Sequence, residues 1–232
     1  MDLKPENDKL VFTFDADRLN LIGSIETDHL GTIPIGSKTP FLIKYDSTVE
    51  EKHLIFEKKG TSYYVINKST YGSYYRIKPN ICTTVPFNVY VIIGKTWLYA
   101  TKEKEEKCLL LFFNENYKSI MPPQLIDSKK EVIIGKSLGD ITISGDSSMS
   151  KMHLRLKANE KDISIMDWRS GTGSKNGTWV QFQAGEIVGN VVDFRIGMQT
   201  FFRFTKGNRC PKSNMLSFAP QYVNPNESNI IS

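Results

Sequence analysis

The amino-acid sequence predicts an all-β protein made of two β-sandwich domains in tandem. Its apolar runs are short and rich in Val, Ile, Phe and Tyr, and turns rich in Gly, Asn, Asp and Ser separate them at strand spacing. No segment keeps a helical apolar period over three turns. The same order of sequence motifs also occurs twice in the 232 residues, which is long enough for two domains.

The repeat rests on five matches that occur in the same order in both halves of the chain. Gly36 and Gly135 stand 99 positions apart (135 − 36), and His53 and His153 stand 100 apart (153 − 53). The other matches are LVFTF with LLLFF, YYVINKSTYGSYY with ISIMDWRSGTGSKNGTWV, and VIIGKTWLYA with FRIGMQTFFRF. Five ordered matches with nearly constant offsets indicate a repeated domain.

The domain boundaries follow from changes in composition. The run TKEKEEK at 101–107 is charged and has no apolar anchor, so it is predicted to be a short linker. Residues 1–100 then form the first sandwich and residues 108–206 the second. The tail at 207–232 contains chain-breaking residues and many Asn and Ser, and it is predicted to be irregular, although Met215, Leu216, Phe218 and Tyr222 could pin part of it onto a domain.

Composition and charge narrow the classes of protein. The net charge of +5 and the pI near 8.9 come from Lys and Arg spread along the chain, which is typical of a solvated surface. Cys82, Cys108 and Cys210 are odd in number and lack CxxC spacing, so we expect reduced thiols. The start MDLKPENDK is charged, and no apolar run could cross a bilayer. We expect a soluble intracellular protein with no membrane partner; nucleus, cytosol and cytoskeletal assembly are not distinguished.

The sequence does not favour an enzyme. The histidines are His29, His53 and His153, and there is no GxSxG, Walker or metal-ligand pattern. The GxG at 171–173 lacks the strand-to-helix setting of a dinucleotide site. We therefore expect no catalytic residue, no metal and no cofactor. Tyrosines such as Tyr63 and Tyr64 could stack on bases, but their position within strands favours packing over nucleic-acid binding.

The segment from Glu131 to Val180 carries the clearest functional signal. Three polar turns lie between its apolar runs, and sandwich strands place such turns at one end of a sheet. A phosphate group needs cationic donors, a hydroxyl and free backbone N–H groups. The residues of these turns that supply such groups are Lys136, Ser150, Lys151 and Lys175.

The order GK, SxxH, D, NGT and IG in residues 131–205 resembles the forkhead-associated (FHA) domain family. The resemblance implies an eleven-stranded β-sandwich that binds phosphothreonine peptides, opened by the strand at 109–113. Lys136 matches a position that is usually a phosphate-contacting arginine, and Ser150 and Lys151 match residues that contact phosphate. Asn176 matches the asparagine that hydrogen-bonds the peptide backbone. Lysine at 136 keeps the charge of arginine but not its planar pair of donors.

Other residues of the motif are predicted to support the site. Gly135 and Gly177 permit tight backbone turns, and Thr178 completes the NGT motif. His153 is predicted to brace the loops through backbone hydrogen bonds, not to act as a base. Asp167 is predicted to anchor a loop.

The first half of the chain is predicted to be a degenerate FHA-like copy that binds no phosphate. Glu50 and Glu51 align with Ser150 and Lys151, and two carboxylates would repel a phosphate. Ser37 aligns with Lys136, and Tyr71 aligns with Asn176.

Two functions of different class follow from these patterns. The first is a protein–protein interaction module whose second domain reads a threonine-phosphorylated protein or peptide. The alternative is a phosphate-independent structural or scaffold subunit of a larger multiprotein complex. The degenerate first copy keeps this alternative open, because it retains the framework residues Gly36 and His53 without the phosphate-reading residues.

Overall fold

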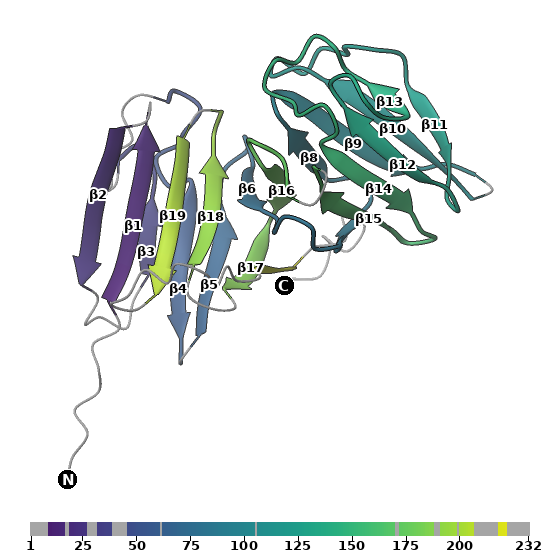
Figure 1. Cartoon of the computed structure of the whole chain (residues 1–232). Helices are drawn as coiled ribbons and strands as arrows, with labels where there is room; N and C mark the ends of the chain where they lie inside the picture. The colour runs from purple at the N-terminus through teal and green to yellow at the C-terminus, as the bar shows by residue number, and fades with distance from the viewer. Residues whose placement is uncertain are drawn as a thin grey trace. The chain divides into compact units, whose positions relative to one another are not determined.

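The computed structural model of the chain is all-β, as the sequence predicts (Figure 1). It describes residues 9–16, 19–26, 32–38, 46–60, 62–104, 106–169, 172–187, 191–198, 200–206 and 218–221. Strands and turns make up these residues. None of them belongs to a helix that is long and apolar enough to cross a membrane.

The chain divides into two compact units. The first unit is Met1–Tyr75 with Phe182–Ser232, and the second unit is Arg76–Gln181. The second unit is therefore continuous in sequence, whereas the first is made from both ends of the chain. Each unit contains two β-sheets.

The second unit contains one sheet in the order β11-β10-β9-β8-β16 and another in the order β13-β12-β14-β15-β7. All pairs are antiparallel except β12 with β13. The strands are β7 (Thr83–Pro86), β8 (Tyr90–Ile93), β9 (Thr96–Lys102), β10 (Lys107–Phe113), β11 (Gln124–Asp127), β12 (Glu131–Gly135), β13 (Ile141–Thr142), β14 (Leu154–Ala158), β15 (Asp162–Asp167) and β16 (Thr178–Phe182), whose last residue belongs to the first unit.

The first unit has the equivalent arrangement, with β6-β18-β19-β1-β2 in one sheet and β20-β17-β5-β4-β3 in the other. Its strands pair antiparallel. They are β1 (Lys9–Ala16), β2 (Leu19–Glu26), β3 (Thr32–Ile35), β4 (Leu54–Lys59), β5 (Ser62–Asn67), β6 (Ser73–Arg76), β17 (Ala184–Ile187), β18 (Val191–Ile196), β19 (Thr200–Lys206) and β20 (Phe218–Gln221). The last residue of β6, Arg76, belongs to the second unit.

Alternating side chains build a core in each unit. In β15 the burial alternates strictly, so that Ile163 and Ile165 are buried while their neighbours are partly exposed. In the first unit, Phe56 of β4 stacks on Phe204 of β19 at 5.4 Å and meets Phe194 of β18 edge-on at 5.8 Å. These strands belong to different sheets, so the aromatic rings join the two layers into a sandwich.

The predicted linker at 101–107 lies in a β-hairpin of the second unit. Cys108 of β10 pairs with Lys102 of β9, and the backbone N–H of Glu103 donates to the carbonyl of Lys107 at 2.9 Å. The predicted boundary at 101–107 therefore lies within the second compact unit, whose own boundaries are at Arg76 and Gln181. A charged run without apolar residues is equally typical of a solvated hairpin turn, and composition does not distinguish the two.

The predicted irregular tail also differs in part, because residues 218–221 form β20. This strand pairs with β17 at the edge of its sheet, with Pro220 opposite Gly185. Proline lacks a backbone N–H and is tolerated in an edge strand, where one side makes no ladder bonds. The rest of the tail lies outside the described residues.

Candidate functional site

The site residues that the sequence predicts come together on three loops of the second unit. The first loop, 136–140, follows β12; the second, 148–152, precedes β14; the third, 174–177, precedes β16. Lys136 lies on the first loop, Ser150 and Lys151 on the second, and Lys175 and Asn176 on the third.

Gly135 lets the first two loops approach each other closely. A Cβ at this buried position would collide with the carbonyl oxygens of Lys151 and Leu138. The absence of a side chain permits three backbone hydrogen bonds from the first loop to the second: Lys136 N–H to Ser150 O at 2.9 Å, Leu138 N–H to Lys151 O at 2.9 Å and Ser137 N–H to Lys151 O at 3.3 Å. These bonds hold Lys136 beside Ser150 and Lys151.

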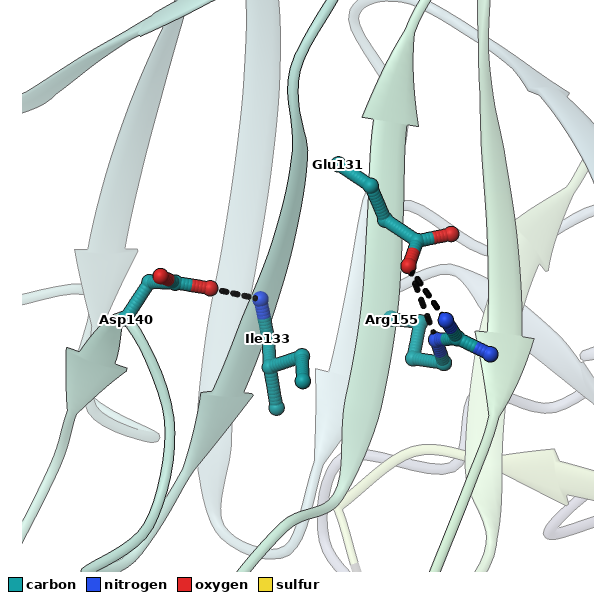
Figure 2. Close-up of polar contacts among 4 residues, drawn as sticks. All are labelled: Glu131, Ile133, Asp140 and Arg155. Carbon is teal, nitrogen blue, oxygen red and sulfur yellow. Dashed lines mark hydrogen bonds and ion pairs between the residues drawn. The ribbon is translucent and has the colours of Figure 1, made fainter.

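Polar contacts at the base of the first loop fix its path. The carboxylate of Asp140 accepts a hydrogen bond from the backbone N–H of Ile133 at 2.8 Å (Figure 2). Across the neighbouring strand pair, Arg155 donates through Nε to Glu131 at 3.0 Å. The guanidinium of Arg155 also lies 4.9 Å from the ring centre of Trp168. Asp140 thus ties the end of the loop that carries Lys136 to β12, while Arg155 joins β14 to the opposite end of that strand.

The third loop is fastened to the second by two hydrogen bonds. The hydroxyl of Ser150 accepts from the backbone N–H of Lys175 at 3.1 Å, and Asn176 Nδ2 donates to the carbonyl of Ser148 at 2.6 Å. Because a serine hydroxyl both accepts and donates, Ser150 retains its hydrogen for an oxyanion. Asn176 likewise retains its second amide hydrogen and its side-chain oxygen as potential peptide contacts.

His153 lies beneath the loops and links two of them. Its Nδ1 accepts from the backbone N–H of Ser150 at 3.1 Å, and its Nε2 lies 3.1 Å from the carbonyl of Gly177. These roles require a neutral ring with the proton on Nε2. Burial lowers the pKa of His153, although the carboxylate of Asp167 acts in the opposite direction. The side chain is fully buried and therefore braces the loops without facing a ligand.

Two further contacts orient the third loop from the protein side. The carboxylate of Asp167 accepts from the backbone N–H of Ser174 at 2.6 Å. Gly177 has a φ of +75°, and a Cβ there would collide with the guanidinium of Arg76. The buried Thr178 begins β16, and its carbonyl accepts from the backbone N–H of Ile77 at 3.0 Å.

The three lysines give the loops a net positive charge. Lys151 and Lys175 are exposed, and Lys136 is half-buried. Within the described part of the chain, none of the three ammonium groups forms an ion pair. Three cations beside a serine hydroxyl can bind a dianionic oxyanion chemically, because each N–H or O–H donor then forms a charge-assisted hydrogen bond.

A cavity of about 440 Å³ lies along the segment 142–147, which leads into the second loop. Its lining includes polar groups from Lys95, Asn114 and Ser147 and apolar groups from Ile120, Met121 and Ile143. The described residues contain no group of three His, Cys, Asp or Glu side chains suited to a metal ion.

The first unit keeps the framework of the site without its cationic groups. His53 Nδ1 accepts from the backbone N–H of Glu50 at 3.3 Å, and its Nε2 lies 2.9 Å from the carbonyl of Gly72. Burial lowers the pKa of His53, as it does for His153. A Cβ on Gly36 would collide with the carbonyl oxygens of Glu50 and Glu51. In the second unit, a Cβ on Gly135 would collide with the carbonyl oxygens of Lys151 and Leu138.

A carboxylate occupies the position of the Ser150 hydroxyl in the first unit. Glu50 accepts from Thr70 through the backbone N–H at 3.0 Å and through Oγ1 at 2.6 Å. These hydrogen bonds lower the pKa of Glu50. Glu51 pairs with Lys38, and Tyr71, which aligns with Asn176, is exposed. A negative side chain thus bridges the two loops that Ser150 bridges in the second unit.

Sequence reasoning missed the contribution of the first half of the chain to the second unit. Arg76 lies against Gly177, with its guanidinium 6.0 Å from the ring centre of Trp179. Lys95 and Thr96 contact Asp146 on the segment that leads to Ser150. The repeat match between Gly94 and Gly197 was the signal in the sequence, since it marked two equivalent hairpins.

Comparison with known proteins identifies one family. Neither the curated proteins nor the solved structures contain a match to this chain. The family model of the FHA domain matches residues 132–198, which include all three loops. This segment, with its sandwich strands and its GK, SxxH and NGT loops, is therefore an FHA domain segment.

Proposed function

We propose that the second unit binds threonine-phosphorylated peptides of a partner protein through Lys136, Ser150, Lys151, Lys175 and Asn176. FHA domains are phosphopeptide-binding protein-interaction modules, and the family match covers these five residues. The observation that carries the proposal is that three lysines, which form no ion pair with any residue that the structure describes, lie with the Ser150 hydroxyl on adjacent loops.

The roles of the residues follow from their chemistry. Lys136 and Lys151 neutralise the phosphate, and the Ser150 hydroxyl donates to a phosphate oxygen. Each charge-assisted hydrogen bond contributes about 1.5 to 3 kcal/mol. Three such bonds contribute about 4.5 to 9 kcal/mol. With peptide contacts that offset the cost of association, the total is of the order of 8 kcal/mol, which corresponds to a micromolar dissociation constant.

Asn176 and the neighbouring cavity suit the peptide around the phosphoresidue. The side chain of Asn176 is exposed and retains hydrogen-bonding groups for a peptide backbone. The cavity beside the second loop has room for a side chain of the peptide and offers both polar and apolar contacts.

We propose that the first unit has no phosphate-binding role and that the protein is not an enzyme. Glu50 places a negative charge at the position of Ser150, which would repel a phosphate. His53 and His153 each use both ring nitrogens in contacts with the backbone, so neither is available as a base. The first unit would then serve as a structural domain of a larger protein complex.

A phosphothreonine peptide library tests the proposal directly. The full-length chain should retain peptides that are lost after phosphatase treatment. Lys136→Ala should weaken binding about tenfold or more, the equivalent of one charge-assisted hydrogen bond. Lys157→Ala is the matched control, because Lys157 is an exposed lysine of the same unit that lies opposite Glu131, at the other end of β12 from the loops. Equal retention of phosphorylated and unphosphorylated peptides would favour the scaffold function instead.

A further inference from the structure

Each unit receives its closing hairpin from the other half of the chain. The hairpin of β8 and β9 belongs to the first sequence repeat, yet it pairs with β16 and β10 in the second unit. The equivalent hairpin of β18 and β19 belongs to the second repeat, yet it pairs with β6 and β1 in the first unit. The two halves have therefore exchanged equivalent hairpins within one chain.

Asp146 connects the exchanged hairpin to the second loop. Its Oδ2 accepts from the backbone N–H of Lys95 at 2.7 Å and from Thr96 Oγ1 at 2.9 Å. Its Oδ1 accepts from the backbone N–H of Ser148 at 2.8 Å. The hairpin turns at Gly94 with a φ of +67°, and a Cβ there would lie 2.7 Å from Asp146 Oδ2. The carboxylate, which is 7% exposed, thus fits closely into the tip of the hairpin.

Hydrogen bonds and the backbone connect Asp146 to Asn176 and Ser150, which are proposed to bind the ligand. Ser148, which donates to Asp146, accepts a hydrogen bond from Asn176 Nδ2 at 2.6 Å. The backbone N–H of Met149 donates to the carbonyl of Asp146 at 3.3 Å, and Ser150 follows directly. A displacement of Asp146 would therefore move both Ser150 and Asn176.

The first unit repeats this arrangement without a phosphate site. Asp46 accepts from Thr200 Oγ1 at 3.1 Å and from the backbone N–H of Thr48 at 3.0 Å. The hairpin turns at Gly197 with a φ of +58°. The loop after Asp46 leads to Glu50 instead of a serine. Removing the Asp46 contacts should therefore affect stability without affecting a phosphate site, which makes variants of Asp46 and Thr200 controls for variants of Asp146 and Thr96.

We propose that the hairpin of the first repeat is part of the phosphopeptide site, in which Thr96 and Asp146 are positioning residues for Ser150 and Asn176. The inference rests on the proposed function for its ligand. It goes further in making binding depend on the hairpin of β8 and β9, whose residue Thr96 lies outside the segment matched by the family model. The segment 108–206, although it carries every motif residue, is then not a complete binding unit.

Double-mutant cycles in the full chain test the exchange without a ligand. Urea unfolding is measured for Thr96→Val, Asp146→Ala and the double variant, and for Thr200→Val, Asp46→Ala and their double variant. The cross pair, Thr96→Val with Asp46→Ala, is measured as well. Residues in contact are non-additive, so Thr96→Val should have little further effect once Asp146 is removed. Additivity in this pair, or coupling of Thr96 to Asp46, would overturn the exchange.

Peptide affinity tests the positioning role. The phosphothreonine peptide of the library that binds best to the wild-type chain is titrated into each single variant. Thr96→Val should weaken binding about three- to tenfold, the equivalent of one neutral hydrogen bond. Thr200→Val, which loses the equivalent contact in the first unit, should leave affinity unchanged. Unchanged affinity in Thr96→Val, or equal losses in both variants, would overturn the positioning role. A wild-type chain that binds no phosphopeptide would refute the proposed function, while the unfolding cycles would still decide the exchange.

Discussion

Gly135→Ala should separate the first two loops and destabilise the second unit. The added Cβ would lie 2.7 Å from the carbonyl oxygen of Leu138 and closer still to that of Lys151. Both obstacles are backbone atoms, so no side-chain rotation can relieve the contact. The loops must move apart.

The cost follows from the hydrogen bonds that hold these loops together. Three backbone bonds join residues 136–138 to residues 150 and 151. Each contributes about 0.5 to 1.5 kcal/mol, so their loss should lower the free energy of unfolding by about 2 to 4 kcal/mol. Lys136 would also leave its place beside Ser150, and phosphopeptide binding should fall with it.

The assay is urea unfolding with Gly145→Ala as the matched control. Gly145 lies near the same loops, but a Cβ there meets no atom within 4 Å and its φ is not in the left-handed region. Gly145→Ala should therefore leave stability nearly unchanged or raise it slightly, because alanine restricts the unfolded chain. Equal unfolding midpoints for the two variants would refute the role given to Gly135.

Three further predictions concern titratable groups. Hydrogen bonds from Thr70 lower the pKa of Glu50 in the folded protein, so the ionised carboxylate stabilises the fold above its unfolded-state pKa and this stabilisation is lost as the pH falls through the folded-state pKa. The difference in unfolding midpoint between the wild type and Glu50→Gln should therefore shrink from about pH 6 to pH 3. A difference that stays constant over this range would contradict the prediction. Burial lowers the pKa of His153 in the folded protein, so the unfolded state binds more protons and the free energy of unfolding should fall as the pH drops below about 6.5. If the thermal unfolding midpoint of a His153→Asn variant changed with pH as steeply as that of the wild type, the bracing role of the neutral ring would be contradicted. Burial raises the pKa of Cys108 to about 11, whereas Cys82 is exposed. In a Cys210→Ser background, a thiol reagent at neutral pH should modify Cys82 quickly and Cys108 only on unfolding, which mass spectrometry would detect; equal rates would show that Cys108 is accessible.

The sequence predicts the fold class and the site residues because both produce short, local patterns in the sequence. Short apolar runs between turn residues indicate strands, and the GK, SxxH and NGT turns fall at strand ends. The comparison of the two halves also separates the framework residue His153 from the loop residue Ser150, because the framework recurs at His53 while Glu50 replaces the serine.

The hairpin exchange could not be predicted from the sequence, and the reason is physical. Thr96 and Thr200 are equivalent, as are Asp46 and Asp146, so either hairpin has the groups needed to satisfy either aspartate. The order of the strands in space then depends on the connections between them and not on local pattern. The role of Arg76 was hidden for the same reason, because it lies in the other half of the sequence from its neighbour Gly177.

The central claim is that Ser150 and its neighbouring lysines read a phosphate on threonine. The most direct measurement is a calorimetric titration of one library-selected peptide, in phosphorylated and unphosphorylated forms, into the wild-type chain, Ser150→Ala and the control Ser128→Ala, whose serine lies in the turn between β11 and β12, outside the three loops and the cavity lining. We expect micromolar binding of the phosphorylated form alone, a loss of about tenfold or more in Ser150→Ala, and no change in Ser128→Ala. Equal binding of both peptide forms, or full affinity in Ser150→Ala, would contradict the central claim.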